Sequence, residues 1–166
     1  MVWIVVLLAI VVVALMALAG QRAERGGQVG YPYIPAKRLF SDAERTFLTV
    51  LDQAVGSDHR VFGKVRVGDV ALVKPGLGRS ASQGALNRIA SKHFDYVVCR
   101  ASDLSVVCAV ELNDRSHGSK RAQARDELVA KVCGVIRLPL LTVTARPAYV
   151  VDEVRGSFLQ LISPTT

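Results

Sequence analysis

Apolar positions after residue 38 follow two different spacings in turn, and this alternation predicts an α/β domain. Residues 41–44 (Ser-Asp-Ala-Glu) form a capping-box pattern, and the apolar residues after them recur every three or four positions, which predicts a helix ending at Gly56. Residues 60–74 alternate loosely and predict a strand, whereas the glycines and proline of residues 74–80 predict a mobile loop. Residues 86–90 then predict one or two helical turns.

Two β-rich runs, residues 93–99 and 106–113, are separated by a short polar turn and predict an antiparallel hairpin. A helix is predicted over residues 118–133, with Ser119 as its N-cap and Gly134 in the C′ position. The apolar stripe of this helix is expected at Ala124, Leu128 and Val132.

The rest of the chain completes the predicted sheet. Residues 139–144 form an apolar run that predicts a buried strand, and residues 149–162 predict a last helix. Strand, helix and strand in succession imply a right-handed crossover onto a parallel neighbour. The predicted fold class is therefore α/β, with a mixed sheet made of an antiparallel hairpin plus a parallel strand, flanked by helices on both faces.

The hairpin carries one carboxylate in each of its apolar strands. If Asp103 lies near the middle of the turn, residues whose numbers sum to about 206 face one another by the antiparallel pairing rule, so Asp95 lies opposite Glu111. Like charges on directly opposed residues are destabilising. A divalent cation, a shared proton or a nearby Lys or Arg is needed to offset the repulsion. The same register pairs Val97 with Ala109 and Cys99 with Val107.

The period of two along a strand decides which side chains accompany this pair. It places Asn113 on the face of Glu111 and turns Leu112 the other way. An Asp, a Glu and an Asn side chain then converge on one patch, where we expect the chemistry. A slip of one residue would move Glu111 to the other face, so this expectation depends on the register.

The first twenty residues differ in character from the rest. Residues 2–19 contain no charged or polar side chain and would form about 27 Å of helix, close to one bilayer core. A cleaved secretory signal and an uncleaved anchor are both compatible with this run, but no positive charge precedes it. Basic residues follow it, which favours an anchor in the cytoplasmic (inner) membrane with the soluble domain in the cytoplasm. The expected organisation is a transmembrane anchor (1–20), a flexible basic tether (21–38) and the α/β domain (39–162).

Charge and cysteine content narrow the possible partners. The formal net charge is +7 and the pI is near 9.7, which suits a polyanion such as nucleic acid or anionic lipid headgroups, although basic residues beside an apolar segment also serve topology alone. The three cysteines are an odd number without a short pairing. We expect three small buried side chains in a reducing compartment and no disulfide-linked partner.

The order of the predicted elements resembles the restriction-endonuclease-like, three-layer core of the PD-(D/E)xK nucleases. In both, a helix and a strand come first, a hairpin carrying an Asp and a Glu follows, and another helix and strand complete the core. Residues 39–162 are similar to the DUF2726 family, in which a comparable apolar segment precedes such a domain. The most specific parts are residues 93–97 (His-Phe-Asp-Tyr-Val) and 110–117 (Val-Glu-Leu-Asn-Asp-Arg-Ser-His). The run ending in His117 is also similar to the site of very-short-patch-repair endonucleases.

This resemblance implies phosphodiester cleavage that depends on Mg²⁺ or Mn²⁺. Asp95 and Glu111 would hold the metal, with the backbone carbonyl of Leu112, and the ion would polarise the phosphate and lower the pKa of an attacking water. Glu44 would be an additional acid from the first helix, or else only the N3 partner of its cap. Contacts to nucleic acid would come from Lys92, His93, Arg121 and Arg125.

The chain departs from the PD-(D/E)xK pattern at one position. The pattern has Lys two residues after the Glu, and this chain has Asn113, which orients a water but carries no charge. Either His117, Lys120 or Arg125 replaces the lysine, or the domain binds without cutting. Three hypotheses follow: a membrane-tethered nuclease, a degenerate module that only binds nucleic acid, and a membrane-associated scaffold whose basic surface meets lipid headgroups or a protein partner.

Overall fold

The computed structural model describes Trp3 and residues 6–8, 10–16, 31–113 and 120–163, with the side chains of Lys120 and Arg121 left out. The chain divides into two units, Met1–Leu39 and Phe40–Thr166. The second unit contains all the strands and helices discussed below.

The described residues contain no helix that is long and apolar enough to cross a membrane. The transmembrane helix predicted over residues 1–20 is therefore not found in the part of the chain that the structure describes.

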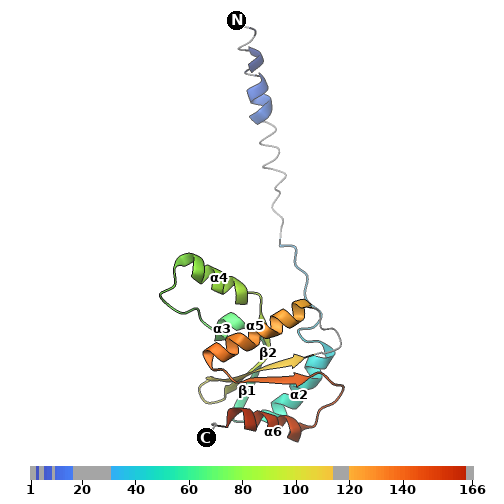
Figure 1. The fold of residues 1–166 in the computed structure, drawn as a ribbon. Helices are drawn as coiled ribbons and strands as arrows, with labels where there is room; N and C mark the ends of the chain where they lie inside the picture. The colour runs from blue at the N-terminus through green and yellow to red at the C-terminus, as the bar shows by residue number, and fades with distance from the viewer. Residues whose placement is uncertain (1–2, 4–5, 9, 17–30, 114–119, 164–166) are drawn as a thin grey trace. The chain divides into compact units, whose positions relative to one another are not determined.

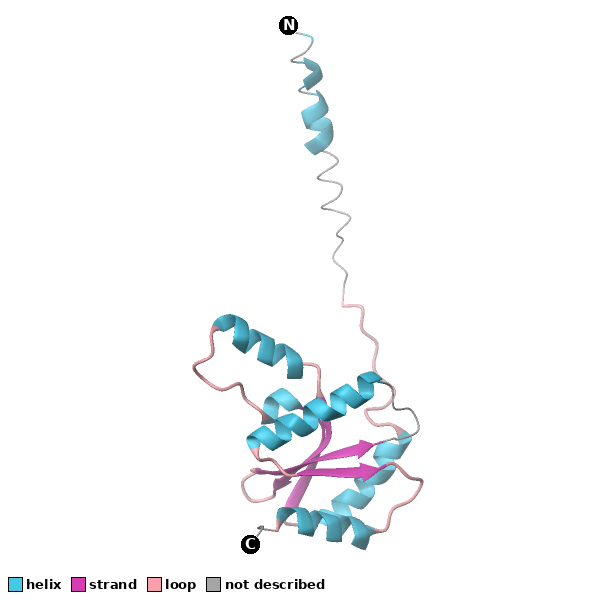
Figure 2. Cartoon of the chain, viewed as in Figure 1, coloured by secondary structure: helices cyan, strands magenta, loops and turns pink. Residues whose placement is uncertain are grey.

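The second unit is an α/β domain around a four-stranded mixed sheet of order β1-β2-β3-β4. Strands β1, β2 and β3 are antiparallel neighbours, and β4 lies parallel to β3, as the strand-helix-strand order predicted. Figures 1 and 2 show these strands at the centre of the domain with helices around them. The elements are α2 (Asp42–Val55), β1 (His59–Arg66), α3 (Val67–Val70), α4 (Arg79–Ile89), β2 (His93–Arg100), β3 (Val106–Asn113), α5 (Lys120–Ile136), β4 (Leu140–Thr144) and α6 (Val151–Ile162).

Helices cover both faces of the sheet, as expected (Figure 1). On one face α2 and α6 pack against alternate strand residues, and the buried cluster includes Phe47, Tyr96 and Phe158. On the other face α5 contributes Val129 and Cys133. The predicted apolar stripe on α5 was therefore wrong by one position. Val129 and Cys133 are buried, whereas the predicted Leu128 and Val132 are only partly buried and Ala124 is exposed.

The register of the hairpin follows the predicted sum of 206 where the acids lie. Tyr96 pairs with Val110, and the next two pairs keep the same sum. A bulge then shifts the register, so Cys99 faces Val106 rather than Val107. The extra residue is absorbed beside the turn, away from Asp95, which is why the pairing of the acids survives.

Two other boundaries differ from the sequence-based expectation. Strand β1 ends at Arg66, and the expected continuation becomes the short helix α3. Helix α5 runs through Gly134 to Ile136, and Arg137, with φ of 56°, is the left-handed residue after it. The backbone N–H groups of Arg137 and Leu138 donate to the carbonyls of Gly134 and Cys133, which closes the end of the helix. The three cysteines are buried, as expected, and their thiols are free.

Candidate active site

Two buried carboxylates lie side by side on β2 and β3. Asp95 is 7% exposed and Glu111 is 8% exposed, and they are the buried charged residues of the described core. Because Tyr96 pairs with Val110, the register continued by one residue places the two acids opposite each other. The backbone N–H of Leu112 donates to Oδ2 of Asp95 at 2.9 Å, which ties the aspartate to the neighbouring strand.

The environment of Glu111 opposes its negative charge. Burial, followed by repulsion from Asp95, raises the pKa of Glu111 to about 7, although the Arg125 guanidinium acts in the opposite direction. Arg125 donates to Oε2 of Glu111 at 3.0 Å. The other oxygen, Oε1, is buried and has no hydrogen-bond partner among the described residues. The repulsion expected from the sequence is therefore present, and one oxygen of the pair is left for a further ligand.

Lys64 is the functional candidate that sequence reasoning missed. Its ammonium donates to Oε1 of Glu44 and lies 3.5 Å from Oδ1 of Asp95. Gly63 pairs with Tyr96 in the β1–β2 register, so Lys64 falls opposite Asp95. Three neighbouring strands thus carry a Lys, an Asp and a Glu at successive positions across the sheet.

The backbone at Lys64 explains how its side chain reaches two carboxylates. The residue has φ of 56°, a left-handed conformation that a non-glycine residue adopts at a cost of about 1–3 kcal/mol. Strand β1 is an edge strand, and this irregularity brings the ammonium to Glu44 of α2 as well as to Asp95 of β2. No local sequence pattern marks such a position, because the preceding Gly63 and the alternation of β1 suggest an ordinary strand.

Glu44 has the structural role that the capping box predicted. Its Oε2 accepts from the backbone N–H of Ser41, and the Ser41 hydroxyl accepts from the backbone N–H of Glu44. Burial tends to raise the pKa of Glu44, but the hydrogen bonds from Lys64 and Ser41 outweigh it and lower the pKa. Tyr96 donates its hydroxyl to the backbone carbonyl of Glu44 at 2.6 Å, so the start of α2 is attached to the strand that carries Asp95.

A pocket of about 290 Å³ opens beside Glu111, between β3, β4 and α5. Asn113 and Leu112 both line it, and Leu112 also packs against the α2 and α6 cluster. Thr142 of β4 pairs with Glu111 in the parallel register and adds a hydroxyl to the lining. Asp126 also lines the pocket and forms an ion pair with Arg125 at 3.1 Å.

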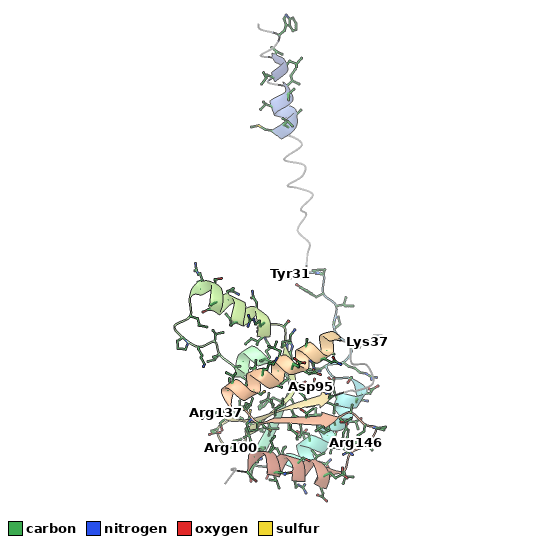
Figure 3. The ribbon with its side chains drawn as sticks, viewed as in Figure 1. Tyr31, Lys37, Asp95, Arg100, Arg137 and Arg146 are labelled. Atoms are coloured by element: carbon green, nitrogen blue, oxygen red, sulfur yellow. The ribbon has the colours of Figure 1, made fainter. Side chains whose placement is uncertain are left out.

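The remaining predicted residues lie in different places. His117 is outside the described residues, and so are the side chains of Lys120 and Arg121. Lys92 and His93 stand at the start of β2, two or three positions before Asp95. Figure 3 shows Asp95 between α5 and the strands. Within the described part of the chain, the structure thus brings together Asp95, Glu111, Asn113, Arg125, Glu44 and Lys64.

Asp95 and Glu111 are the residues considered as ligands of a metal ion. Among the described residues, no three His, Cys, Asp or Glu side chains form a group able to hold a metal ion. Glu44 is directed to Lys64 and Ser41, so it does not join Asp95 and Glu111 in such a group. The orphaned, buried oxygen of Glu111 beside a second carboxylate nevertheless fits a hard cation that takes oxygen ligands.

Comparison with known proteins places the chain in a family. The family model DUF2726, whose description is "protein of unknown function", matches residues 36–161. The chain belongs to the DUF2726 family. No curated protein and no solved structure shows significant similarity to it. The DUF2726 match spans the sheet, α2 to α5 and all but the last residue of α6, so every residue of the candidate site lies within the family's domain.

Proposed function

We propose that this DUF2726 domain cleaves phosphodiester bonds of nucleic acid with the help of a divalent cation, Mg²⁺ or Mn²⁺, held by Asp95 and Glu111. The observation that carries the proposal is the buried Oε1 of Glu111, which has no partner among the described residues. A buried carboxylate oxygen without a partner costs free energy. A cation at that oxygen would remove both this cost and the repulsion from Asp95.

The way each carboxylate is held supports the fit. Asp95 is fixed through Oδ2 by the N–H of Leu112, and Glu111 is fixed through Oε2 by Arg125. Each acid therefore uses one oxygen for orientation, and Glu111 keeps Oε1 for a ligand. When bound, a divalent cation polarises a phosphate oxygen and lowers the pKa of a water molecule.

Lys64 would supply the positive charge that the PD-(D/E)xK pattern takes from a lysine two residues after the glutamate. Asn113 stands at that position and carries no charge. Lys64 reaches Asp95 from β1 instead, at 3.5 Å. Its role would be to stabilise negative charge that develops on the phosphate, which a neutral amide does only weakly.

Arg125 would bind the substrate. Its guanidinium lies at the pocket beside Glu111, and 43% of its side chain is exposed. A guanidinium pairs with phosphate oxygens through two parallel hydrogen bonds. Arg125 would hold a phosphate with the donors of its guanidinium that do not bind Glu111.

A second candidate function is binding of nucleic acid without cleavage. It is favoured by the ion pairs already present, since Lys64 contacts Asp95 and Arg125 contacts Glu111. In this case Asp95 and Glu111 would serve only to position the side chains of Lys64 and Arg125 on a basic surface. The net charge of +7 suits a polyanionic ligand under either proposal.

Cleavage assays distinguish the two functions. The full chain is incubated with end-labelled single- and double-stranded DNA and RNA, in Mg²⁺, in Mn²⁺ or in EDTA. We expect metal-dependent cleavage that falls at least a hundredfold in Asp95→Asn and in Glu111→Gln, because each removes a ligand charge. Asp152→Asn, which changes an exposed carboxylate on α6 that does not line this pocket, is the matched control.

The outcomes separate clearly. Absence of cleavage with every DNA and RNA form in both metals would refute the first proposal. Binding that weakens with salt and survives both substitutions would then support the second. Cleavage that persists in Asp95→Asn and Glu111→Gln would show that the reaction uses other residues.

A further inference from the structure

Helix α4 stands apart from the rest of the domain and exposes a polar face. Figure 1 shows it held away from the sheet, and Ile89 is its buried residue. One side of its C-terminal half, including Ala85 and Ile89, lines an apolar groove of about 350 Å³ against Leu128 and Val132 of α5. The other side faces solvent and forms a shallow hollow lined by Arg79, Ser80, Gln83, Gly84 and Asn87.

The charge around α4 has one sign. Residues 70–94 contain four Lys or Arg residues and no Asp or Glu. Among the described residues, Lys74, Arg79 and Arg88 form no ion pair closer than 4 Å. An exposed helix usually balances its cations with acids at neighbouring turns. The imbalance here is complementary to a polyanion.

The side chains on the exposed face are those that read base edges. Arg79, Gln83 and Asn87 recur every four residues, so they lie along one face of the helix. Arginine pairs with guanine, and glutamine or asparagine pairs with adenine, each through two hydrogen bonds in the major groove. Ser80 and Gly84 lie beside them, and their small size lets the helix backbone approach a ligand closely.

A hydrogen bond between two of these residues sets the orientation of their amides. Gln83 donates from Nε2 to Oδ1 of Asn87 at 2.9 Å. This bond leaves the carbonyl of Gln83 as an acceptor and the amide nitrogen of Asn87 as a donor. An acceptor next to a donor matches the N6 amino group and the N7 atom of adenine.

A short connection joins the C-terminal end of α4 to the strand that carries Asp95. Only residues 90–92 separate the helix from β2; the N–H of Lys92 donates to the carbonyl of Ile89, and the carbonyl of Lys92 accepts from the N–H of Val67. Asp95 is the third residue of β2, about 7 Å along the strand from its start. A nucleic acid on α4 would therefore pass Lys92 and His93 on its way to Asp95.

We infer that α4 docks into the major groove of duplex DNA and selects the sequence that the domain acts on, an inference that rests on the proposed function. From Arg79 to Asn87 the helix rises about 12 Å, the length of three to four base pairs. Duplex DNA is favoured over duplex RNA because the deep, narrow major groove of A-form RNA does not admit side chains of a helix.

The test measures binding in EDTA, where metal-dependent cleavage does not interfere. A fluorescein-labelled pool of random 24-base-pair duplexes is titrated with the full chain, and the bound fraction is sequenced. We expect Arg79→Ala to weaken binding about tenfold at 0.1 M salt and to remove the guanine preference at the position that Arg79 reads. Gln83→Ala with Asn87→Ala should reduce the adenine enrichment of the bound sequences about tenfold.

Matched variants keep the result interpretable. Gln160→Ala removes an exposed amide from α6, and Arg60→Ala removes an exposed arginine from β1, so both should bind like the wild type. Arg79→Lys keeps the charge and should retain the salt slope while losing the guanine preference. Equal melting temperatures of all variants show that α4 has folded.

The outcomes bear separately on the inference and on the proposed function. If the α4 variants bind and enrich the same sequences as the wild type, the inference is refuted, even where metal-dependent cleavage is observed. If single-stranded nucleic acid or RNA binds more tightly than the duplex, and the α4 variants leave that binding unchanged, the inference is also refuted. If the α4 variants lose duplex binding but the wild type cleaves nothing, the inference is supported and the proposed cleavage fails.

Discussion

Replacing Glu111 by glutamine should stabilise the metal-free domain at alkaline pH. Glutamine has nearly the same shape but carries no charge, so it removes the repulsion from Asp95 and the cost of burying a charge. In the folded protein the pKa of Glu111 lies at about 7, against an ordinary value of 4.5. A carboxyl group with a raised pKa favours folding when it is protonated and opposes folding when it is ionised.

The magnitude follows from this difference in pKa. At 1.36 kcal/mol per pKa unit, ionised Glu111 costs about 3 kcal/mol of folding free energy above pH 7. The cost is absent below pH 4.5, grows between pH 4.5 and 7, and is constant at higher pH. The attraction of the partly exposed Arg125 is already included in this pKa. The expected net gain at pH 8 is therefore about 3 kcal/mol.

Thermal unfolding in EDTA measures the gain. For a domain of this size, about 3 kcal/mol corresponds to a rise in Tm on the order of 9–15 °C at pH 8. At pH 5 the difference between variant and wild type should fall to about a quarter of that value. Glu127→Gln on α5 removes a well-exposed carboxylate and should leave Tm unchanged at both pH values. Adding Mg²⁺ at a hundred times its Kd should stabilise the wild type by about 2.7 kcal/mol and the Glu111→Gln variant by much less.

Two results would refute the reasoning about Glu111. An unchanged or lower Tm for Glu111→Gln at pH 8 would mean that burial and Asp95 do not oppose the charge. A gain of equal size at pH 5 and pH 8 would mean that the substitution improves packing rather than relieving an ionised group.

Three further predictions test the surroundings of the site. Lys64→Met should tighten Mn²⁺ binding, measured by calorimetry, because the ammonium group that competes with the metal for Asp95 is gone. The same substitution should slow cleavage at least tenfold, and weaker Mn²⁺ binding would contradict the prediction. Gly63→Ala places a Cβ against the ring of Phe40 and should cost about 1–3 kcal/mol in urea unfolding, since the ring must leave its stacked position on Tyr96. Unchanged stability would show that Phe40 moves freely. Tyr96→Phe removes the 2.6 Å hydrogen bond to the backbone of α2 and should cost about 1 kcal/mol by the same method, while a neutral result would show that the bond is not needed.

Local patterns in the sequence sufficed for several elements. The cap of α2 needs only a Ser and a Glu three residues apart, so the helix start at Asp42 was predicted correctly. The hairpin register followed from the turn position and the apolar alternation, which is why the neighbourhood of Asp95 and Glu111 was found without the structure. The parallel β4 followed from the handedness of crossover connections.

Other elements needed the tertiary structure because their stability comes from distant contacts. Helix α4 is longer than the one or two turns predicted from the sequence. Its first residues are polar or small and show no apolar period, so only the side that lines the groove with α5 was recognised. The buried stripe of α5 is set by the sheet beneath it, so Val129 and Cys133 could not be told from their neighbours by spacing alone. The apolar N-terminal residues met the requirement of length and hydropathy in the sequence but not as a described helix.

The sequence by itself determined where the acids lie, and the tertiary structure decided which cations accompany them. Spacing of two along a strand and the sum of residue numbers across a hairpin are local rules, and they suffice to bring Asp95 and Glu111 together. Lys64 comes from an edge strand that precedes the hairpin by some thirty residues. Its contact with Asp95 depends on strand order and on a left-handed backbone, and both arise only when the whole sheet has formed.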